Sequence, residues 1–201
     1  MSFSPSFDAL VQALTCLSGV GKKTAQRMAL DLLLKKNAEA ATLAKALTTA
    51  LATVQRCRYC RNLSDAEVCL LCADPLRNRQ QICVVETPAD VIAIEQATDY
   101  RGLFFVLMGH IAPLDGMGPE ALGMDILDDR LANEAISELV LATNATLEGE
   151  TTAYFLAELA AKHGIQATRL AYGVPLGSEL SYIDKQTLHH AFQSRDHYHE
   201  L

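Results

Sequence analysis

The sequence predicts a multidomain protein of mixed α and β structure. In chain order we expect a helical head, a four-cysteine metal-binding segment, an α/β domain with a mainly parallel sheet, and a short C-terminal segment. Three observations support this organisation. Apolar residues first recur at helical spacing, four cysteines then form two close pairs, and short apolar runs finally alternate with amphipathic stretches. The expected boundaries are 1–55, 56–79, 80–175 and 176–201.

The head is expected to contain three helices. Apolar side chains repeat at the helical period over 7–14 and again over 23–35, as in helices with one buried face. A third stretch, 38–54, is rich in Ala, Leu and Thr. The first two helices are joined by a short turn that contains Gly19 and Gly21.

This glycine-containing turn is a candidate phosphate site. Gly19 and Gly21 permit positive φ and leave the backbone bare, so amide groups can approach a phosphate. The next helix offers its N-terminus and the positive end of its dipole to the same anion, while Lys22, Lys23 and Arg27 add charge. Two helices joined in this way resemble a helix-hairpin-helix, a motif that holds the DNA backbone without reading its sequence.

This turn has two other interpretations. A nucleotide-binding P-loop does not fit, because position 16 is Cys where Gly is required and position 23 is Lys where Ser or Thr is required. An ordinary helix connection with solvated lysines remains the alternative.

The cysteines of the second segment predict one structural zinc ion. They form two Cys-x-x-Cys pairs separated by eight residues, Cys57 with Cys60 and Cys69 with Cys72. Four thiolates complete the closed tetrahedral shell of a structural zinc site. Two disulfides would not require paired knuckles and are disfavoured in a reducing cytoplasm, whereas an iron–sulfur cluster remains an alternative on spacing alone. The other two cysteines lie in apolar runs and are expected in the core: Cys16 and Cys83.

Strands and helices alternate in the third segment. Apolar runs typical of buried parallel strands occupy 82–85, 103–108, 139–142 and 167–171. The helices expected between them cover 89–97, 129–138 and 151–163. The polar C-terminal segment is expected to be anchored by Tyr182, Leu188 and Phe192.

Carboxylates stand at the expected end of the first of these strands. Glu86 follows the strand directly, and Asp90 enters the next helix. This opening resembles a Toprim domain, the module of primases and topoisomerases in which Asp-x-Asp after a later strand helps to hold Mg²⁺. Here Asn144 and Thr146 occupy the two Asp positions, which should weaken a Mg²⁺ site and abolish catalysis. The acidic residues left on this face, for a weak metal site or a partner, are Glu86, Asp90, Glu148 and Glu150.

Charge is distributed unevenly along the chain. The net charge is −7, but residues 1–79 carry 11 Lys and Arg against 6 Asp and Glu, while residues 80–201 carry 6 against 18. Exposed charges more than about 10 Å apart are largely screened at ordinary salt. A basic head can therefore bind phosphate locally, and the acidic body should confine DNA to it. Five arginines near the cysteines favour DNA binding: Arg56, Arg58, Arg61, Arg77 and Arg79.

The helix-hairpin-helix, the four-cysteine segment and the degenerate Toprim domain, in this order, resemble the RecR family of recombination mediators. The resemblance covers essentially the whole chain and extends to residues 86–90, 109–116, 142–144 with 148–150, and 173–180. Three residues stand where the family usually has Pro: Ser18, Lys22 and Ala145.

The resemblance implies a protein of bacterial DNA repair that catalyses no reaction. It would act with RecO, and in some settings RecF, to load recombinase onto single-stranded DNA coated by single-strand-binding protein. The implied assembly is a ring-like homotetramer, formed through the head and the C-terminal segment, that binds single- and double-stranded DNA irrespective of sequence. The alternative function is a metal-dependent Toprim nuclease or a topoisomerase-like enzyme, which Asn144 and Thr146 disfavour.

The expected location is the cytoplasm, with no membrane partner. No apolar run approaches the roughly 20 residues of a membrane span. The first residues lack the basic stretch and apolar block of a secretory signal. The resemblance adds association with the bacterial nucleoid.

Overall fold

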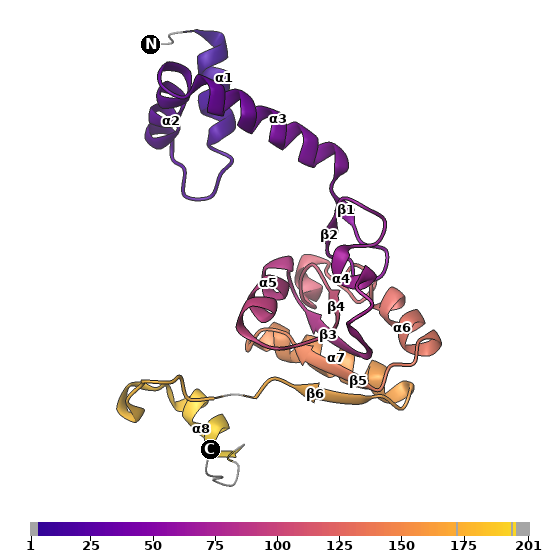
Figure 1. Cartoon of the computed structure of the whole chain (residues 1–201). Coiled ribbons are helices and arrows are strands. Elements are labelled where there is room, and N and C mark those ends of the chain that lie inside the picture. Colours follow the sequence, from indigo (N-terminus) through magenta and orange to yellow (C-terminus); the bar gives the residue numbers. More distant parts are fainter. Residues whose placement is uncertain (1–3, 172, 194, 196–201) are drawn as a thin grey trace. The chain divides into compact units, whose positions relative to one another are not determined.

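The computed structural model describes residues 4–171, 173–193 and 195 (Figure 1). The chain divides into two compact units, Met1–Val54 and Gln55–Leu201. The first unit is helical, and the second is built around a four-stranded parallel sheet. The predicted combination of a helical head with a parallel α/β domain is thus confirmed.

The first unit consists of α1 (Pro5–Leu14), α2 (Lys22–Leu34) and α3 (Asn37–Thr53). Each helix begins and ends within two residues of its predicted bounds. α1 begins where Ser4 Oγ accepts a hydrogen bond from the Phe7 amide at 3.1 Å, which satisfies one of the unpaired amides of the first turn. A small core of Phe7, Val11, Ala25 and Ala29 joins α1 to α2.

The helical head leaves apolar residues exposed in two places. Cys16 is exposed, which corrects the prediction that it lies in the core. α1 ends at Leu14, so Cys16 falls in the turn beyond the helix, away from the small core between α1 and α2. α3 has no buried residue, and three leucines on its successive turns are largely exposed: Leu43, Leu47 and Leu51.

The sheet of the second unit has the order β4-β3-β5-β6, and every neighbouring pair is parallel. Its strands are β3 (Asn78–Val85), β4 (Gly102–Val106), β5 (Glu138–Ala142) and β6 (Gln166–Arg169). The helices that connect them are α5 (Pro88–Ala97), α6 (Met124–Asn133) and α7 (Leu147–Lys162).

Alternate residues of β3 face two different cores. Ile82 and Val84 join a larger core with side chains of α6 and α7. Cys83 and Val85 join a smaller core with Val91 of α5. A strand buried on both faces requires a continuous apolar run, which is why this strand could be predicted. The expected burial of Cys83 is confirmed.

The helix predicted over 129–138 was misplaced. It is α6, which begins at Met124 and ends at Asn133. Glu134 is already extended, with φ −105° and ψ 153°, and Ile136 is buried at the entrance to β5. The error arose because Ile136 repeats the apolar period of the helix although it belongs to the connection.

β4 lies at an edge of the sheet and is nevertheless buried along its whole length. The four-cysteine segment, with β1 (Gln55–Arg56), β2 (Leu63–Ser64) and α4 (Leu70–Ala73), lies beside it. The Val106 amide donates to the Cys60 carbonyl at 2.8 Å, and Arg77 Nη1 donates to the Gly102 carbonyl at 2.9 Å. The segment therefore satisfies backbone groups that an open edge would leave to water or to another chain.

The C-terminal segment contains α8 (Lys185–Gln193). Tyr182 is 85% exposed and Phe192 is 69% exposed, while Leu188 is half-buried. The two rings therefore do not anchor this segment within a single chain. Across the described ranges, no helix is both long enough and apolar enough to cross a bilayer.

Candidate zinc centre and nucleic-acid interface

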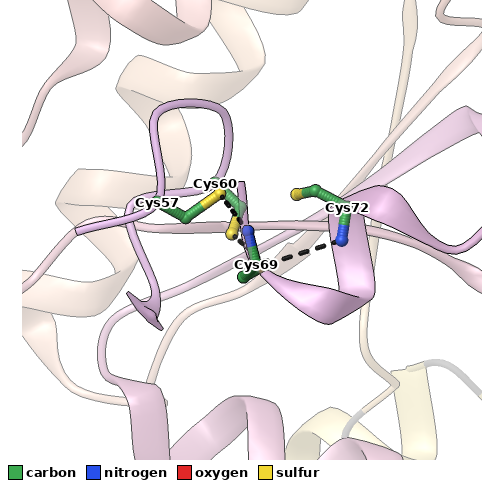
Figure 2. Close-up of side chains that lie close together, drawn as sticks. All are labelled: Cys57, Cys60, Cys69 and Cys72. Carbon is green, nitrogen blue, oxygen red and sulfur yellow. Dashed lines mark hydrogen bonds between the residues drawn. The ribbon is translucent and has the colours of Figure 1, made fainter. Parts of the chain in front are cut away.

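Two short loops of the second unit bring four cysteine side chains together (Figure 2). The Cys57 amide donates to the Asn62 carbonyl at 2.7 Å, which closes the first loop around Cys60. Cys69 precedes α4, and its sulfur accepts a hydrogen bond from the Cys72 amide at 3.5 Å. All four sulfur atoms lie within 4.8 Å of one another, and all four residues are buried.

This donor set fits zinc. A tetrahedral ion with Zn–S bonds of about 2.3 Å would hold its sulfur ligands about 3.8 Å apart, and the sulfurs of Cys60 and Cys69 are 3.4 Å apart. All six cysteines are free rather than joined in disulfides. Four thiolates leave no position for a substrate, so the site is structural. Among the described residues, no other group of His, Cys, Asp and Glu side chains converges in this way.

Crowding of the thiols changes their acidity. The hydrogen bond with Cys69 raises the pKa of Cys60, and the same contact lowers the pKa of Cys69. Hydrogen bonds with Cys60 and Cys69 also raise the pKa of Cys72. The protein alone therefore favours a partly protonated cluster, and a divalent cation would allow every ligand to become a thiolate with release of protons.

Two arginines hold the zinc segment against the α/β domain. Arg61, which has a φ of 61°, donates to the carbonyl groups of Ala121 and Leu122. Arg130 of α6 donates to the Tyr59 carbonyl at 3.1 Å, and both arginines are buried. Sequence reasoning missed these contacts because the partners are separated by 60 and 71 residues. Neither pairing leaves a local signal in the sequence.

The five arginines that favoured DNA binding have different environments. Arg61 and Arg77 are buried and donate to backbone carbonyls. Arg58 forms an ion pair with Glu67 at 2.9 Å. Arg56 and Arg79 are exposed and, within the described part of the chain, pair with no carboxylate. Only these two retain a charge that is open to an anion.

The turn between α1 and α2 places its candidate residues at an exposed helix start. α2 begins at Lys22, with Gly21 as its N-cap, no side chain capping the first amides and no acidic residue in its first turn. Gly19 has a φ of 78°, which favours glycine, whereas Gly21 has a φ of −80° and contributes only its lack of a side chain. Lys22, Lys23 and Arg27 are exposed, and among the described residues none forms an ion pair. Uncapped amides beside unpaired cations are able to hold a phosphate.

Glu86 directly follows β3 and is only 3% exposed. Its Oε1 accepts a hydrogen bond from the Asn144 backbone amide at 2.7 Å, and its Oε2 accepts one from the Asn144 side-chain amide at 2.8 Å. His110 Nδ1 lies 3.3 Å from the same Oε2. Gly149 is required beside this pair, because a Cβ there would lie 2.0 Å from the Asn144 carbonyl oxygen. Both oxygens of the Glu86 carboxylate therefore already accept hydrogen bonds from the protein, where a Toprim domain would use this carboxylate for Mg²⁺.

The other acidic residues of this face have separate local roles. Asp90 forms a capping box with Thr87, whose amide donates to Asp90 Oδ2 at 2.7 Å. Glu150 pairs with Arg169 at 2.7 Å. Glu148 is exposed in the first turn of α7, where a negative charge suits the helix dipole. These carboxylates do not converge into a ligand group among the described residues.

Four family models together match almost the whole chain. They describe the RecR helix-hairpin-helix (residues 7–51), the RecR zinc finger domain with four cysteines (54–74), the Toprim domain (80–171) and the RecR C-terminal region (173–195). The zinc-finger match and the buried four-cysteine group together show one structural zinc ion, which confirms the predicted cofactor.

Similar curated proteins are named recombination protein RecR. The protein of Methylococcus capsulatus is 52% identical over 186 residues, which cover 92% of this chain and 94% of the relative. The protein of Hahella chejuensis is 52% identical over 194 residues, or 96% of each chain. The protein of Xanthomonas axonopodis pv. citri is 50% identical over 192 residues, or 96% of this chain and 98% of the relative.

Proposed function

Because this chain belongs to the RecR family of recombination proteins, we propose that it binds DNA as a recombination mediator in bacterial DNA repair. With its relatives it is a recombination protein and not an enzyme, although it contains a Toprim domain. One observation carries the DNA-binding proposal. The uncapped start of α2 is surrounded by exposed cations without an acidic neighbour in the turn, namely Lys22, Lys23 and Arg27.

The proposed role includes partners and a location. With RecO and RecF, the protein loads recombinase onto single-stranded DNA coated by single-strand-binding protein. It works in the cytoplasm at the nucleoid, where its DNA substrate is. The acidic face of the Toprim domain is a candidate contact for one of these proteins, and Glu148 is its exposed carboxylate at the start of α7.

A double substitution, Lys22→Gln with Lys23→Gln, tests DNA binding by the turn. Phosphate contacts carry no sequence information, so affinity should fall alike on unrelated sequences. The salt slope on duplex should fall by about 0.9 for each lost contact. The matched control, Lys35→Gln with Lys45→Gln, removes the same charge from exposed lysines away from the start of α2. Equal binding of both variants and wild type across a salt titration would reduce the turn to a helix connection.

The proposed assembly is a ring-like homotetramer that encloses DNA. Two exposed apolar surfaces support it, the leucine stripe of α3 and the rings of the C-terminal segment. Two kinds of interface suffice to close a tetramer from two pairs of subunits. Light scattering should therefore report dimers for Leu47→Glu and for Phe192→Glu, because each substitution leaves the other interface intact. A monomeric wild type, or tetrameric variants, would contradict this assembly.

The second candidate function is a metal-dependent Toprim nuclease or topoisomerase, which the Toprim match favours. The structure argues against it, since Glu86 is held by Asn144 and its acidic neighbours do not converge. Purified protein should leave labelled DNA uncut and its linking number unchanged when Mg²⁺ is added. Turnover that Glu86→Ala abolishes would establish the enzyme instead.

A further inference from the structure

A pocket of about 550 Å³ lies where the zinc segment meets the α/β domain. Its volume falls within the range of small-ligand sites, about 300–1,000 Å³. The zinc segment, the first half of β3 and the C-terminal end of α6 all contribute to its walls. The lining residues with polar or aromatic groups are Tyr59, Arg79, Gln80, Arg130 and Glu134.

The charged side chains of this pocket differ in how many of their hydrogen-bonding groups are already paired within the protein. Arg130 donates from Nε and Nη2 to the two carboxylate oxygens of Glu134, at 2.8 and 3.0 Å, so the two charges compensate each other. Arg79 is exposed and donates from Nη2 to the Cys72 carbonyl at 3.3 Å. A guanidinium has five N–H donors. Most of those of Arg79 are therefore open to an anion, and their planar fork suits a phosphate.

Tyr59 contributes an aromatic ring from a turn whose backbone is hydrogen-bonded. It lies between the zinc ligands Cys57 and Cys60, and its carbonyl accepts the hydrogen bond from Arg130. The residue is 39% exposed, and the Arg58 guanidinium lies 5.3 Å from the ring centroid. An aromatic ring beside an open guanidinium has the chemistry that recognises one unstacked base and its phosphate.

We propose that this pocket binds one nucleotide of a single-stranded nucleic acid, with the base against Tyr59 and the phosphate at Arg79. Gln80 lines the same pocket, and its amide can both donate and accept hydrogen bonds at a base edge. A duplex cannot use the pocket, because its bases are paired and stacked inside the helix. This inference rests on the DNA-binding function proposed above and adds a subsite that distinguishes single strands from duplex.

Fluorescence anisotropy of a labelled oligothymidylate, and of a labelled duplex of the same length, measures the two binding modes. Tyr59→Ala should weaken single-strand binding about tenfold, as expected for the loss of one stacked base, and leave the salt slope unchanged. Arg79→Gln should lower the single-strand salt slope by about 0.7, as expected for one lost phosphate contact. Duplex binding should be unchanged in both variants, and Tyr59→Phe should bind both DNAs like wild type.

Two matched controls separate the pocket from general surface effects. Tyr154→Ala removes an exposed ring of α7, and Lys185→Gln removes an exposed cation of α8, both outside the pocket lining. Both should bind each DNA like wild type. Zinc content is measured for every variant, because Tyr59 lies inside a cysteine loop. If Tyr59→Ala loses zinc, Arg79→Gln decides the outcome, because residue 79 lies outside both cysteine loops and its substitution removes only one hydrogen bond to the Cys72 carbonyl.

The possible results are distinguishable. Single-strand binding by zinc-loaded Tyr59→Ala and Arg79→Gln equal to wild type would overturn the nucleotide site and leave DNA binding by the head intact. Failure of the wild type to bind either DNA would overturn the DNA-binding function itself. An acidic peptide that binds the wild type but not Arg79→Gln, with oligothymidylate binding unaffected, would assign the pocket to a peptide and overturn the proposal.

Discussion

Two sets of four residues in this chain have the chemistry of metal ligands, but only one set gathers into a site. The four cysteines lie in two loops close together in the sequence, and their sulfurs lie within 4.8 Å of one another. The four carboxylates of the Toprim face have different surroundings. Glu86 is buried, Asp90 caps a helix, Glu150 pairs with an arginine and Glu148 is exposed.

The two sets differ in the groups that compete with a metal for each ligand. The thiols contact one another and backbone amides of the two loops, at 3.3–3.5 Å, and sulfur is a weak acceptor. Zinc therefore replaces weak contacts with strong bonds. Glu86 instead accepts two short hydrogen bonds from Asn144, which a cation would have to displace. Residues of ligand type form a metal site only where their ligand atoms are not already paired in strong hydrogen bonds within the protein.

Removing one zinc ligand should have the largest effect. Cys60→Ser breaks the closed shell, and we expect loss of zinc together with a fall of about 4 kcal/mol or more in the free energy of unfolding, as for other lost structural metals. Elemental analysis and chemical denaturation measure both. Cys16→Ser is the control, because this cysteine is exposed and is no ligand. Normal stability of a metal-free variant lacking all four ligands would show that the zinc is dispensable.

Restoring an acid beside Glu86 tests the other set. Asn144→Asp removes a donor to a buried carboxylate and places a like charge beside it, so the free energy of unfolding should fall by about 3 kcal/mol. Added Mg²⁺ should recover part of this loss, since a cation can bridge two carboxylates. Asn144→Ala, which loses the donor without adding a charge, should gain nothing from Mg²⁺. Equal Mg²⁺ responses of the two variants would show that Asn144 does not replace a ligand.

The contrast also separates what local spacing can predict from what it cannot. The zinc ligands were predictable because all four lie within residues 57–72, where loop length limits the geometry. The contact between Glu86 and Asn144 spans 58 residues. It follows from the parallel register, in which Val85 lies opposite Ala142, so the residues just beyond both strands meet at one edge. The sequence could show that an acid was missing there, but not that its replacement donates to Glu86.

The two errors of placement have a common cause. Cys16 and Ile136 both lie in apolar stretches that continue beyond the end of a helix, which is Leu14 for Cys16 and Asn133 for Ile136. One is exposed in a turn, and the other is buried on the way into a strand. Periodicity alone does not show where a helix ends, because that depends on backbone hydrogen bonds at its last turn.

A substitution at Arg61, which is no metal ligand, tests whether the hydrogen bonds that hold the cysteine loops against the α/β domain are also needed for zinc binding. Arg61→Lys keeps the charge but cannot span the carbonyl groups of Ala121 and Leu122. We expect the free energy of unfolding to fall by about 2 kcal/mol with full zinc content. Arg58→Lys, at an exposed pair, should change it by less than about 0.5 kcal/mol. Zinc loss in Arg61→Lys as complete as in Cys60→Ser would mean that the hydrogen bonds of Arg61 are needed to form the zinc site.

Asp128 provides the mildest test, because its carboxylate is occupied like that of Glu86 but lies nearer the surface. Its oxygens contact Lys162 Nζ at 2.8 Å and His163 Nε2 at 2.5 Å. The hydrogen bond with His163, followed by that with Lys162, holds the pKa of Asp128 below its usual value of 3.8. A lowered folded-state pKa stabilises the fold above the unfolded value, and this stabilisation is lost as the pH falls through the folded value.

We therefore expect Asp128→Asn to lower the free energy of unfolding by about 0.5 kcal/mol at neutral pH, as for other partly exposed pairs. The difference from wild type should shrink as the pH falls below 3.8. Denaturation curves across this range measure it, with Asp129→Asn as the control, since this neighbour is exposed and forms no ion pair among the described residues. A difference from wild type that stays constant as the pH falls below 3.8 would show that the contacts with Lys162 and His163 do not stabilise the charged form of Asp128.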